Sequence, residues 1–177
     1  MKDRIEIVAS GFGGQGVVRM GQIIGEAAVK QGLHVTMLKS HGTEMRGGYV
    51  RSQVVLSKSL IDSPMCETPD HFVALSSAAY KRFKDTVPDY GLILYDPSFV
   101  EEVDADLKCS HKSFPAKELS VKNFDNPLFA NSLVLGVMAK VIEGLDRDLI
   151  LESILDVIPK FHDKNKEAFE IGYAYFK

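Results

Sequence analysis

The sequence predicts a three-layer α/β/α fold, in which helices cover both faces of a mostly parallel β-sheet. Apolar runs of strand length alternate with amphipathic helical segments over the first hundred residues, which is typical of this class. A glycine cluster separates the first apolar run from the first helical segment. The 177 residues are 45% hydrophobic and 25% charged, as in ordinary folded chains. We therefore expect one domain over residues 1–177, large enough to bury its own core.

The first expected elements form a strand–turn–helix–strand unit. A short apolar run predicts a buried strand over residues 5–10. Apolar residues at helical spacing predict a helix over residues 15–30, and Gly32 supplies a C-terminal stop. Residues 34–38 are typical of a second strand. A βαβ unit of this kind joins parallel strands, so we expect a Rossmann-like sheet.

The remaining chain is expected to add strands first and helices later. Strands are expected over residues 49–56, 72–76 and 92–95, and helices over residues 77–85, 132–142 and 147–158. Residues 101–126 are polar and receive no assignment. Two amphipathic helices would thus close the chain, and they either cover the second face of the sheet or dock on something else.

Charge and cysteine content exclude several function classes. The net charge of −3 makes the surface a poor binder of polyanions, so no nucleic-acid partner is expected. No apolar run approaches the ~18 residues that span a bilayer, and the N-terminus lacks a signal core, which predicts a cytoplasmic protein. Cys66 and Cys109 allow one disulfide arithmetically, but a reduced setting is the simpler expectation.

A glycine turn lies between the first expected strand and helix. Residues 11–16 (GFGGQG) match the pattern G-x-G-x-x-G. Glycines there let the backbone turn tightly and approach a phosphate, which the helix N-terminus attracts. We therefore expect Gly11, Gly13, Gly14, Gln15 and Gly16 to bind an anionic cofactor. The alternative is that these glycines only allow close packing of strand and helix.

The residues that follow this turn narrow the choice of anion. Val17 and Val18 stand where a P-loop needs Lys and Ser or Thr, so an NTPase is excluded. The second strand ends in Leu38-Lys39-Ser40 and lacks the acid that binds the ribose hydroxyls of NAD. Lys39 either favours an additional phosphate or is an ordinary solvated lysine.

A second glycine-containing loop follows the second strand at residues 40–48 (SHGTEMRGG). The guanidinium of Arg46 can bind a carboxylate or phosphate, and the carboxylate of Glu44 can orient this guanidinium. We expect Glu44, Arg46, Gly47 and Gly48 to join the cofactor site. The alternative is a solvated turn with an internal Glu44–Arg46 pair.

Other polar residues indicate neither catalysis nor metal binding. The five histidines form no HExxH motif and no cluster with cysteine. Ser132 has no base partner in the sequence, and nothing near Cys66 would lower its pKa. Asp96, before Pro97, is expected to start a turn, and a ligand-facing role is the alternative. We therefore expect no catalytic residue and no metal ligand in this chain.

Several of these segments together resemble a known family. The turn at residues 11–16, the loop at residues 44–48 (EMRGG) and Asn131 before an apolar helix resemble the gamma subunit of 2-oxoacid:ferredoxin oxidoreductases. Residues 168–173 (AFEIGY) are similar to the family's C-terminal signature. The resemblance spans essentially the whole chain, and similar domains occur in indolepyruvate:ferredoxin oxidoreductases.

The resemblance implies an accessory subunit of a larger oxidoreductase. Such holoenzymes decarboxylate a 2-oxo acid on thiamine diphosphate, pass electrons through iron–sulfur clusters to ferredoxin and release an acyl-coenzyme A. The implied partners are a thiamine-diphosphate subunit with its magnesium, an alpha subunit and a ferredoxin-like subunit, with ferredoxin reached indirectly. Coenzyme A is the implied ligand of the glycine loops, and the alternative is that these loops only contact partner subunits. Kinship at residues 51–55 and 75–80 favours 2-oxoglutarate over pyruvate.

The residues independently predict that the isolated chain is inactive. A cubane iron–sulfur cluster needs four closely spaced cysteines, and the Gly-Asp-Gly stretch of a thiamine-diphosphate site is absent. Two other functions stay open: a free-standing dehydrogenase using an NADP-like cofactor, and a binding module that senses a nucleotide. We also expect the isolated chain to form a homodimer or larger species. The apolar stripe Leu149, Ile150, Ile154, Val157 and Ile158 would mediate this contact, unless it is an ordinary core face.

Overall fold

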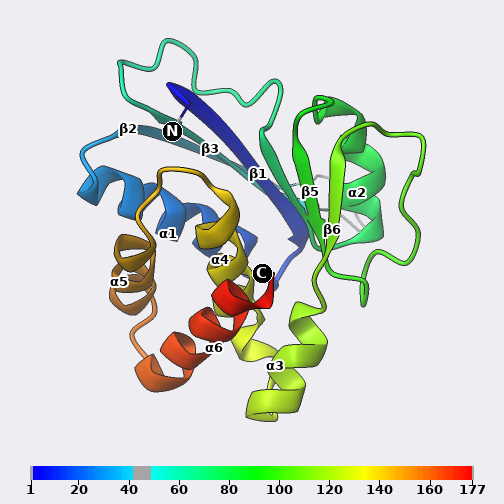
Figure 1. Cartoon of the computed structure of the whole chain (residues 1–177), viewed down its shortest axis with the longest axis vertical. Coiled ribbons are helices and arrows are strands. Elements are labelled where there is room, and N and C mark those ends of the chain that lie inside the picture. Colours follow the sequence, from blue (N-terminus) through cyan, green and yellow to red (C-terminus); the bar gives the residue numbers. More distant parts are fainter. Residues whose placement is uncertain (1, 42–48, 177) are drawn as a thin grey trace.

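The computed structural model describes residues 2–41 and 49–176 (Figure 1). Six strands form a sheet in the order β2-β3-β1-β4-β5-β6. The strands are β1 (Arg4–Phe12), β2 (His34–His41), β3 (Tyr49–Ser57), β4 (His71–Ala74), β5 (Leu92–Tyr95) and β6 (Ser110–Ser113). Strands β1, β4, β5 and β6 are parallel, whereas β3 is antiparallel to both of its neighbours. The mostly parallel sheet is confirmed.

The first two strands are not neighbours, which corrects the simple βαβ expectation. Helix α1 (Val17–Lys30) leads from β1 to β2, but β3 lies between these strands and pairs with both. Strand β3 carries the consecutive buried residues Val54, Val55 and Leu56, and burial on both faces favours an interior position in the sheet. Strand β2 still points along β1, so both strands end at the edge where β3 begins.

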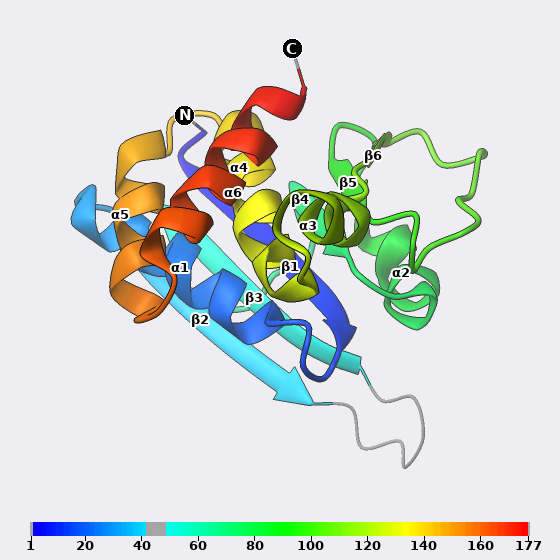
Figure 2. The same ribbon diagram turned by 90° about the horizontal axis from the view of Figure 1, so that it is seen from below.

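The two faces of the sheet are covered unequally (Figures 1 and 2). Helix α1 and four later helices share one face and one large core. These later helices are α3 (Ala116–Phe124), α4 (Ala130–Val141), α5 (Arg147–Val157) and α6 (His162–Tyr175). The other face carries the short α2 (Ser77–Phe83) and the 3-10 turn η1 (Lys84–Thr86), over a smaller core that includes Phe72 and Ile93. The three predicted layers are present.

The end of the chain differs from the prediction in two ways. The chain closes with three helices, α4, α5 and α6, whereas two were expected, and α6 is the one that the sequence did not predict. All three pack on the face of α1 rather than on the second face. Glycines allow α4 and α6 to approach closely: a Cβ on Gly172 would overlap the Leu133 carbonyl oxygen, and one on Gly136 would overlap that of Phe169. Within residues 168–173, the segment that resembles a family signature, Gly172 is therefore required by the close packing of α6 on α4.

The apolar stripe of α5 belongs to the core. Ile150 and Ile154 are fully buried, and Leu149, Val157 and Ile158 pack against the same cluster. The stripe is thus an ordinary core face, and self-association of the isolated chain stays a prediction that does not rest on it. No helix among the described residues has both the length and the apolar character needed to cross a membrane.

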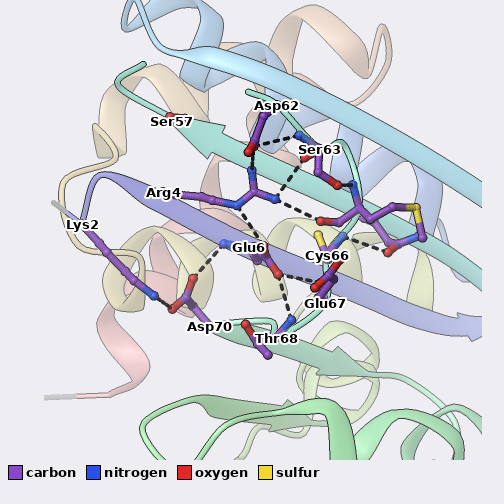
Figure 3. A network of polar contacts seen from close by, with 12 residues as sticks. Lys2, Arg4, Glu6, Ser57, Asp62, Ser63, Cys66, Glu67, Thr68 and Asp70 are labelled. Atoms are coloured by element: carbon purple, nitrogen blue, oxygen red, sulfur yellow. Dashed lines mark hydrogen bonds and ion pairs between the residues drawn. The ribbon is translucent and has the colours of Figure 1, made fainter. Parts of the chain in front are cut away.

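A polar network fixes the β3–β4 connection to the start of β1 (Figure 3). Glu6 is only 8% exposed, and its carboxylate accepts hydrogen bonds from Arg4 Nε at 2.9 Å and from the backbone N–H groups of Glu67 and Thr68 at 2.8 and 3.0 Å. The carboxylate of Asp70 accepts the N–H of Glu6 at 2.8 Å. A buried carboxylate with this many donors is fully satisfied, so the network stabilises the amino-terminal edge of the sheet.

Candidate functional site

A cavity of about 650 Å³ lies at the carboxyl-terminal edge of the parallel strands. Residues that follow three of these strands line it: Gly14 to Gly16 after β1, Leu75 after β4 and Asp96 after β5. Ligands of α/β sheets bind at this edge. The volume falls within the range of roughly 300–1,000 Å³ that is usual for small-molecule sites.

The N-termini of three helices meet at this cavity without side-chain caps. Gly16 precedes α1, Ala130 begins α4 and Phe161 precedes α6, and all three residues line the cavity. Within the part of the chain that the structure describes, no side chain forms a capping hydrogen bond at any of these ends. Helix dipoles leave partial positive charge at such ends, which favours an anion. At α4 the N–H of Ala130 is already bonded to the carbonyl oxygen of Pro127.

Cationic side chains around the cavity also favour an anion. Arg19, Lys117 and Lys160 line it, and none of them forms an ion pair with a carboxylate in the described parts of the chain. Asp96 is 2% exposed, and its two oxygens accept the backbone N–H groups of Ser98 and Lys117, each at 2.8 Å. Asp96 thus starts a turn, as expected, although it also lies on the cavity wall.

Two of the predicted glycines have packing reasons. A Cβ on Gly11 would overlap the Gln15 side-chain oxygen and approach Leu75 Cβ to 2.8 Å. A Cβ on Gly16 would overlap the Asn131 amide, and Gly16 also has a φ of +72°. The close-packing alternative therefore applies to the first and last glycines of the turn.

The middle glycines have no such reason. Gly13 and Gly14 are exposed, and a Cβ on either would meet no atom of residues 2–41 and 49–176 within 4 Å. Gly14 has a φ of +90°, whereas Gly13 is outside the left-handed region. Because Gly13 needs neither space nor an unusual conformation within the described structure, its backbone is open to a ligand.

Gln15 braces the turn from within. Its side-chain oxygen accepts the Phe12 N–H at 2.6 Å, and its amide nitrogen donates to the Leu75 carbonyl at 2.9 Å. These bonds tie the glycine turn to the end of β4. Gln15 is therefore a positioning residue, and its contact with a cofactor stays a prediction.

The second predicted loop lies outside the described residues, and with it Glu44, Arg46, Gly47 and Gly48. Its flanking residues are placed, because His41 pairs with Val50 and Tyr49 pairs with Phe12. Both ends of the segment thus leave the sheet at the edge that carries the glycine turn. The cofactor role of the four residues stays a prediction.

Lys39 does not support an NADP-like site. It is exposed on β2, an edge strand that β3 separates from β1, and it is not among the residues that line the cavity. An adenosine ribose next to the glycine turn would need the second strand beside the first.

The remaining candidates have structural roles. Cys66 and Cys109 are free thiols, and burial raises the pKa of Cys66 to about 12, with a contribution from the charge of Glu6. Ser132 is buried and donates to Asn165 Oδ1 at 2.7 Å. Within residues 2–41 and 49–176, no group of three or more His, Cys, Asp or Glu side chains could hold a metal ion.

Sequence reasoning missed the far wall of the cavity. Lys160, Phe161 and Asn165 line it from the α5–α6 connection and the first turn of α6. Only the stop at Pro159 marked this region, and a helix stop carries no functional signal. These residues line the same cavity as Gly14 to Gly16 through the tertiary packing of α6, which no local pattern encodes.

The sheet, the glycine turn and the cation-lined cavity together define a Rossmann-like α/β domain with a candidate ligand site at the carboxyl-terminal edge of its strands. A family model described as pyruvate ferredoxin/flavodoxin oxidoreductase matches residues 6–175. The chain belongs to this family.

Relatives and a solved structure agree with this assignment. The 2-oxoglutarate synthase subunit KorC of Methanocaldococcus jannaschii is 34% identical, and the match covers 100% of this chain and 96% of KorC. The ketoisovalerate oxidoreductase subunit VorA of Methanothermobacter thermautotrophicus is 35% identical over 95% of this chain, which corresponds to 35% of that longer protein. The crystal structure of a keto/oxoacid ferredoxin oxidoreductase gamma subunit from Geobacter sulfurreducens matches with a TM-score of 0.84 and 26% identity, covering 96% of each chain. The predicted fold class and the resemblance to gamma subunits are confirmed.

Proposed function

We propose that the chain is the gamma-type subunit of a 2-oxoacid:ferredoxin oxidoreductase whose substrate is 2-oxoglutarate. The similarity to KorC carries this proposal, because the two chains match over nearly their whole lengths. VorA is equally similar in sequence, but the corresponding region there is part of a longer chain. The complex would convert its 2-oxo acid to an acyl-coenzyme A and reduce ferredoxin.

Within that complex, this chain binds and orients coenzyme A and performs no chemical step. Gly13 and Gly14 expose their backbone beside the uncapped start of α1, where a phosphate can approach. Arg19, Lys117 and Lys160 add positive charge around the same cavity. Lost charge-assisted bonds of this kind cost about 1.5–3 kcal/mol each, so together they can hold a polyphosphate.

The second loop completes the proposed site. Glu44, Arg46, Gly47 and Gly48 follow β2, and the described residues on either side of the segment, His41 and Tyr49, lie at the edge of the sheet that carries the glycine turn. In this proposal Arg46 meets a phosphate of the coenzyme. Arg46→Ala should then raise the KM for coenzyme A without changing the melting temperature of the complex.

The other cofactors belong to partner chains in this proposal. A thiamine-diphosphate subunit with magnesium, an alpha subunit and a ferredoxin-like subunit with iron–sulfur clusters supply the chemistry. The two free cysteines of this chain are too few for a cubane cluster, which supports the division of labour.

Purification of the tagged chain from its native host tests the proposal. We expect it to bring down these partner subunits, and the eluate to reduce a viologen dye with 2-oxoglutarate and coenzyme A faster than with pyruvate or 2-oxoisovalerate. The chain purified alone should be colourless and inactive. Iron in the isolated chain, or an eluate that lacks partners and 2-oxoacid turnover, would contradict the proposal.

A further inference from the structure

One margin of the sheet is a long strand with an unpaired outer side. Strand β2 has eight residues, and within the described chain it pairs with β3 alone. Its register with β3 continues from His34 to His41 without a break, so no bulge bends the strand away. Figure 2 shows β2 along the outer margin of the sheet. The outward N–H and C=O groups of such a strand can pair with a further strand.

The opposite margin of the sheet is protected against such pairing. Strand β6 has only four residues, and its sequence Ser-His-Lys-Ser is polar throughout. Short length and a charged side chain both discourage the addition of another strand. Strand β2 contains neither proline nor glycine, and Lys39 is its only Lys, Arg, Asp or Glu residue. The open margin of the sheet is therefore β2.

Apolar side chains border this open margin on the face of α1. Val35 and Met37 are half-buried and pack against the large core. A Cβ on Gly25 would lie 3.4 Å from Val35 Cγ1, which places that side of α1 over β2. Val18 and Val29 recur with Gly25 at helical spacing, and Val29 is 59% exposed. Neither valine packs against the core clusters of the described residues, so both are available to a partner.

We propose that two copies of this chain associate by antiparallel pairing of β2 with β2, about a twofold axis at Met37. In an isologous contact each copy presents the same surface. One pairing thus covers both open strands and brings the α1 valines of the two copies toward each other. The self-association expected from the sequence then uses β2 and not the apolar stripe of α5.

Side-chain alternation and charge select the register of this pairing. Opposite residues of an antiparallel pair point to the same face, so the axis passes through a residue and not between two residues. Met37 and Leu38 are at the centre of β2. An axis at Leu38 would bring the two Lys39 side chains to diagonal positions, where like charges repel. An axis at Met37 instead places each Lys39 opposite Val35 of the second copy, and the lysines lie further apart.

Light scattering on the full-length chain tests the association without any substrate. At about 100 μM chain, we expect a mass twice that of one chain, which falls toward the mass of one chain on dilution. The mass of a single chain at this concentration would overturn the proposal. Loss of 2-oxoglutarate turnover in the complex would contradict the proposed function and would not affect this measurement.

Charge substitutions on the other face of β2 test the register. Alternation places Thr36 and Leu38 on the face opposite α1, both half-buried, and the proposed register sets Thr36 of one copy against Leu38 of the other. Leu38→Lys should weaken the dimer at least tenfold, because a charged side chain then faces Thr36 without a partner. Adding Thr36→Glu should restore the dimer, because each new lysine then faces a glutamate of the other copy.

The matched control is Val121→Lys, which adds the same charge at a 44% exposed apolar residue of α3. We expect this variant to dimerise like the wild type, and melting followed by circular dichroism confirms that each variant is folded. Dimerisation of Leu38→Lys at the strength of this control would overturn the proposal. A folded double variant that stays monomeric would overturn the pairing about Met37.

Discussion

The two edges of the sheet differ in whether their charged side chains form ion pairs within the described chain. At the amino-terminal edge, Lys2 pairs with Asp70 at 2.7 Å and Arg4 pairs with the nearly buried Glu6 at 2.9 Å (Figure 3). Each of these carboxylates also accepts backbone N–H groups. Charge at this edge is neutralised within the chain and fixes a loop in place.

At the carboxyl-terminal edge, the cations have no such partners. Arg19, Lys117 and Lys160 surround a cavity without pairing to a described carboxylate, and Asp96 is engaged by backbone N–H groups. Backbone strain is also found here, at Phe161. Unpaired charge and strain cost stability, and their concentration at one edge is the reason that we propose the ligand site there. Substitutions should therefore affect stability at the first edge and coenzyme binding at the second.

The largest effect is expected at Glu6. Glu6→Ala removes the acceptor of three hydrogen bonds, one of them the charge-assisted bond from Arg4 Nε. We expect the free energy of unfolding to fall by about 3 kcal/mol in urea denaturation, with the KM for coenzyme A unchanged. Asp62→Ala is the control, because Asp62 is 97% exposed and its contact with Arg4 is worth less than about 0.5 kcal/mol. Equal effects of the two variants would contradict a stabilising role for the buried network.

A smaller loss of stability is expected at Gly16, on the other edge. Gly16→Ala places a Cβ against the Asn131 amide in a left-handed backbone conformation, which should cost about 2 kcal/mol. Adding Asn131→Ala should restore the part of the unfolding free energy that is lost through overlap with the Asn131 amide. The part that is lost through the left-handed φ at residue 16 should remain. If Gly16→Ala were as stable as the wild type, the packing role of this glycine would be wrong.

A still smaller, pH-dependent effect is expected at His71, at the start of β4. Burial lowers the pKa of His71, and its Nδ1 is buried without a hydrogen-bond partner among the described residues. The unfolded chain therefore takes up this proton first as the pH falls below 6.5. Stability from the neutral imidazole is complete above pH 6.5 and is lost as the pH falls toward the lower folded pKa, by at most about 1.4 kcal/mol per pH unit.

Urea denaturation between pH 7 and pH 5 measures this contribution. We expect His71→Gln to give a flatter dependence of the unfolding free energy on pH than the wild type. Parallel curves for the two proteins would exclude His71 as a source of the pH dependence.

The local parts of the fold were predictable, and the tertiary parts were not. Apolar spacing and the glycine cluster located β1, the turn and α1, because these features act within a few residues. The place of β3 between β1 and β2 depends on strand pairing across the sheet. Strand β6 is a short, polar edge strand without alternation, and polar residues dominate the start of α6, so neither carries a periodic signal.

The candidate site also has one part that the sequence predicted and one part that it did not. The glycine turn was identified from its motif, and the structure separates its packing glycines, Gly11 and Gly16, from the open backbone at Gly13. Lys160 and Phe161 line the same cavity as this turn because α6 packs on α4, with Gly172 against Leu133. A sequence pattern can mark one wall of such a cavity, but the other wall is assembled from distant residues.

The KM for coenzyme A of the intact complex carrying Gly13→Ala tests the central claim most directly. A methyl group at Gly13 meets no described atom and requires no left-handed backbone, so the melting temperature should stay that of the wild type. If a phosphate lies against this backbone, the KM for coenzyme A should rise about tenfold, because a close approach to a charged group is lost. Decarboxylation of the 2-oxo acid, which precedes acyl transfer, should be unchanged. An unchanged KM in a complex with a normal melting temperature would contradict coenzyme binding at the glycine turn.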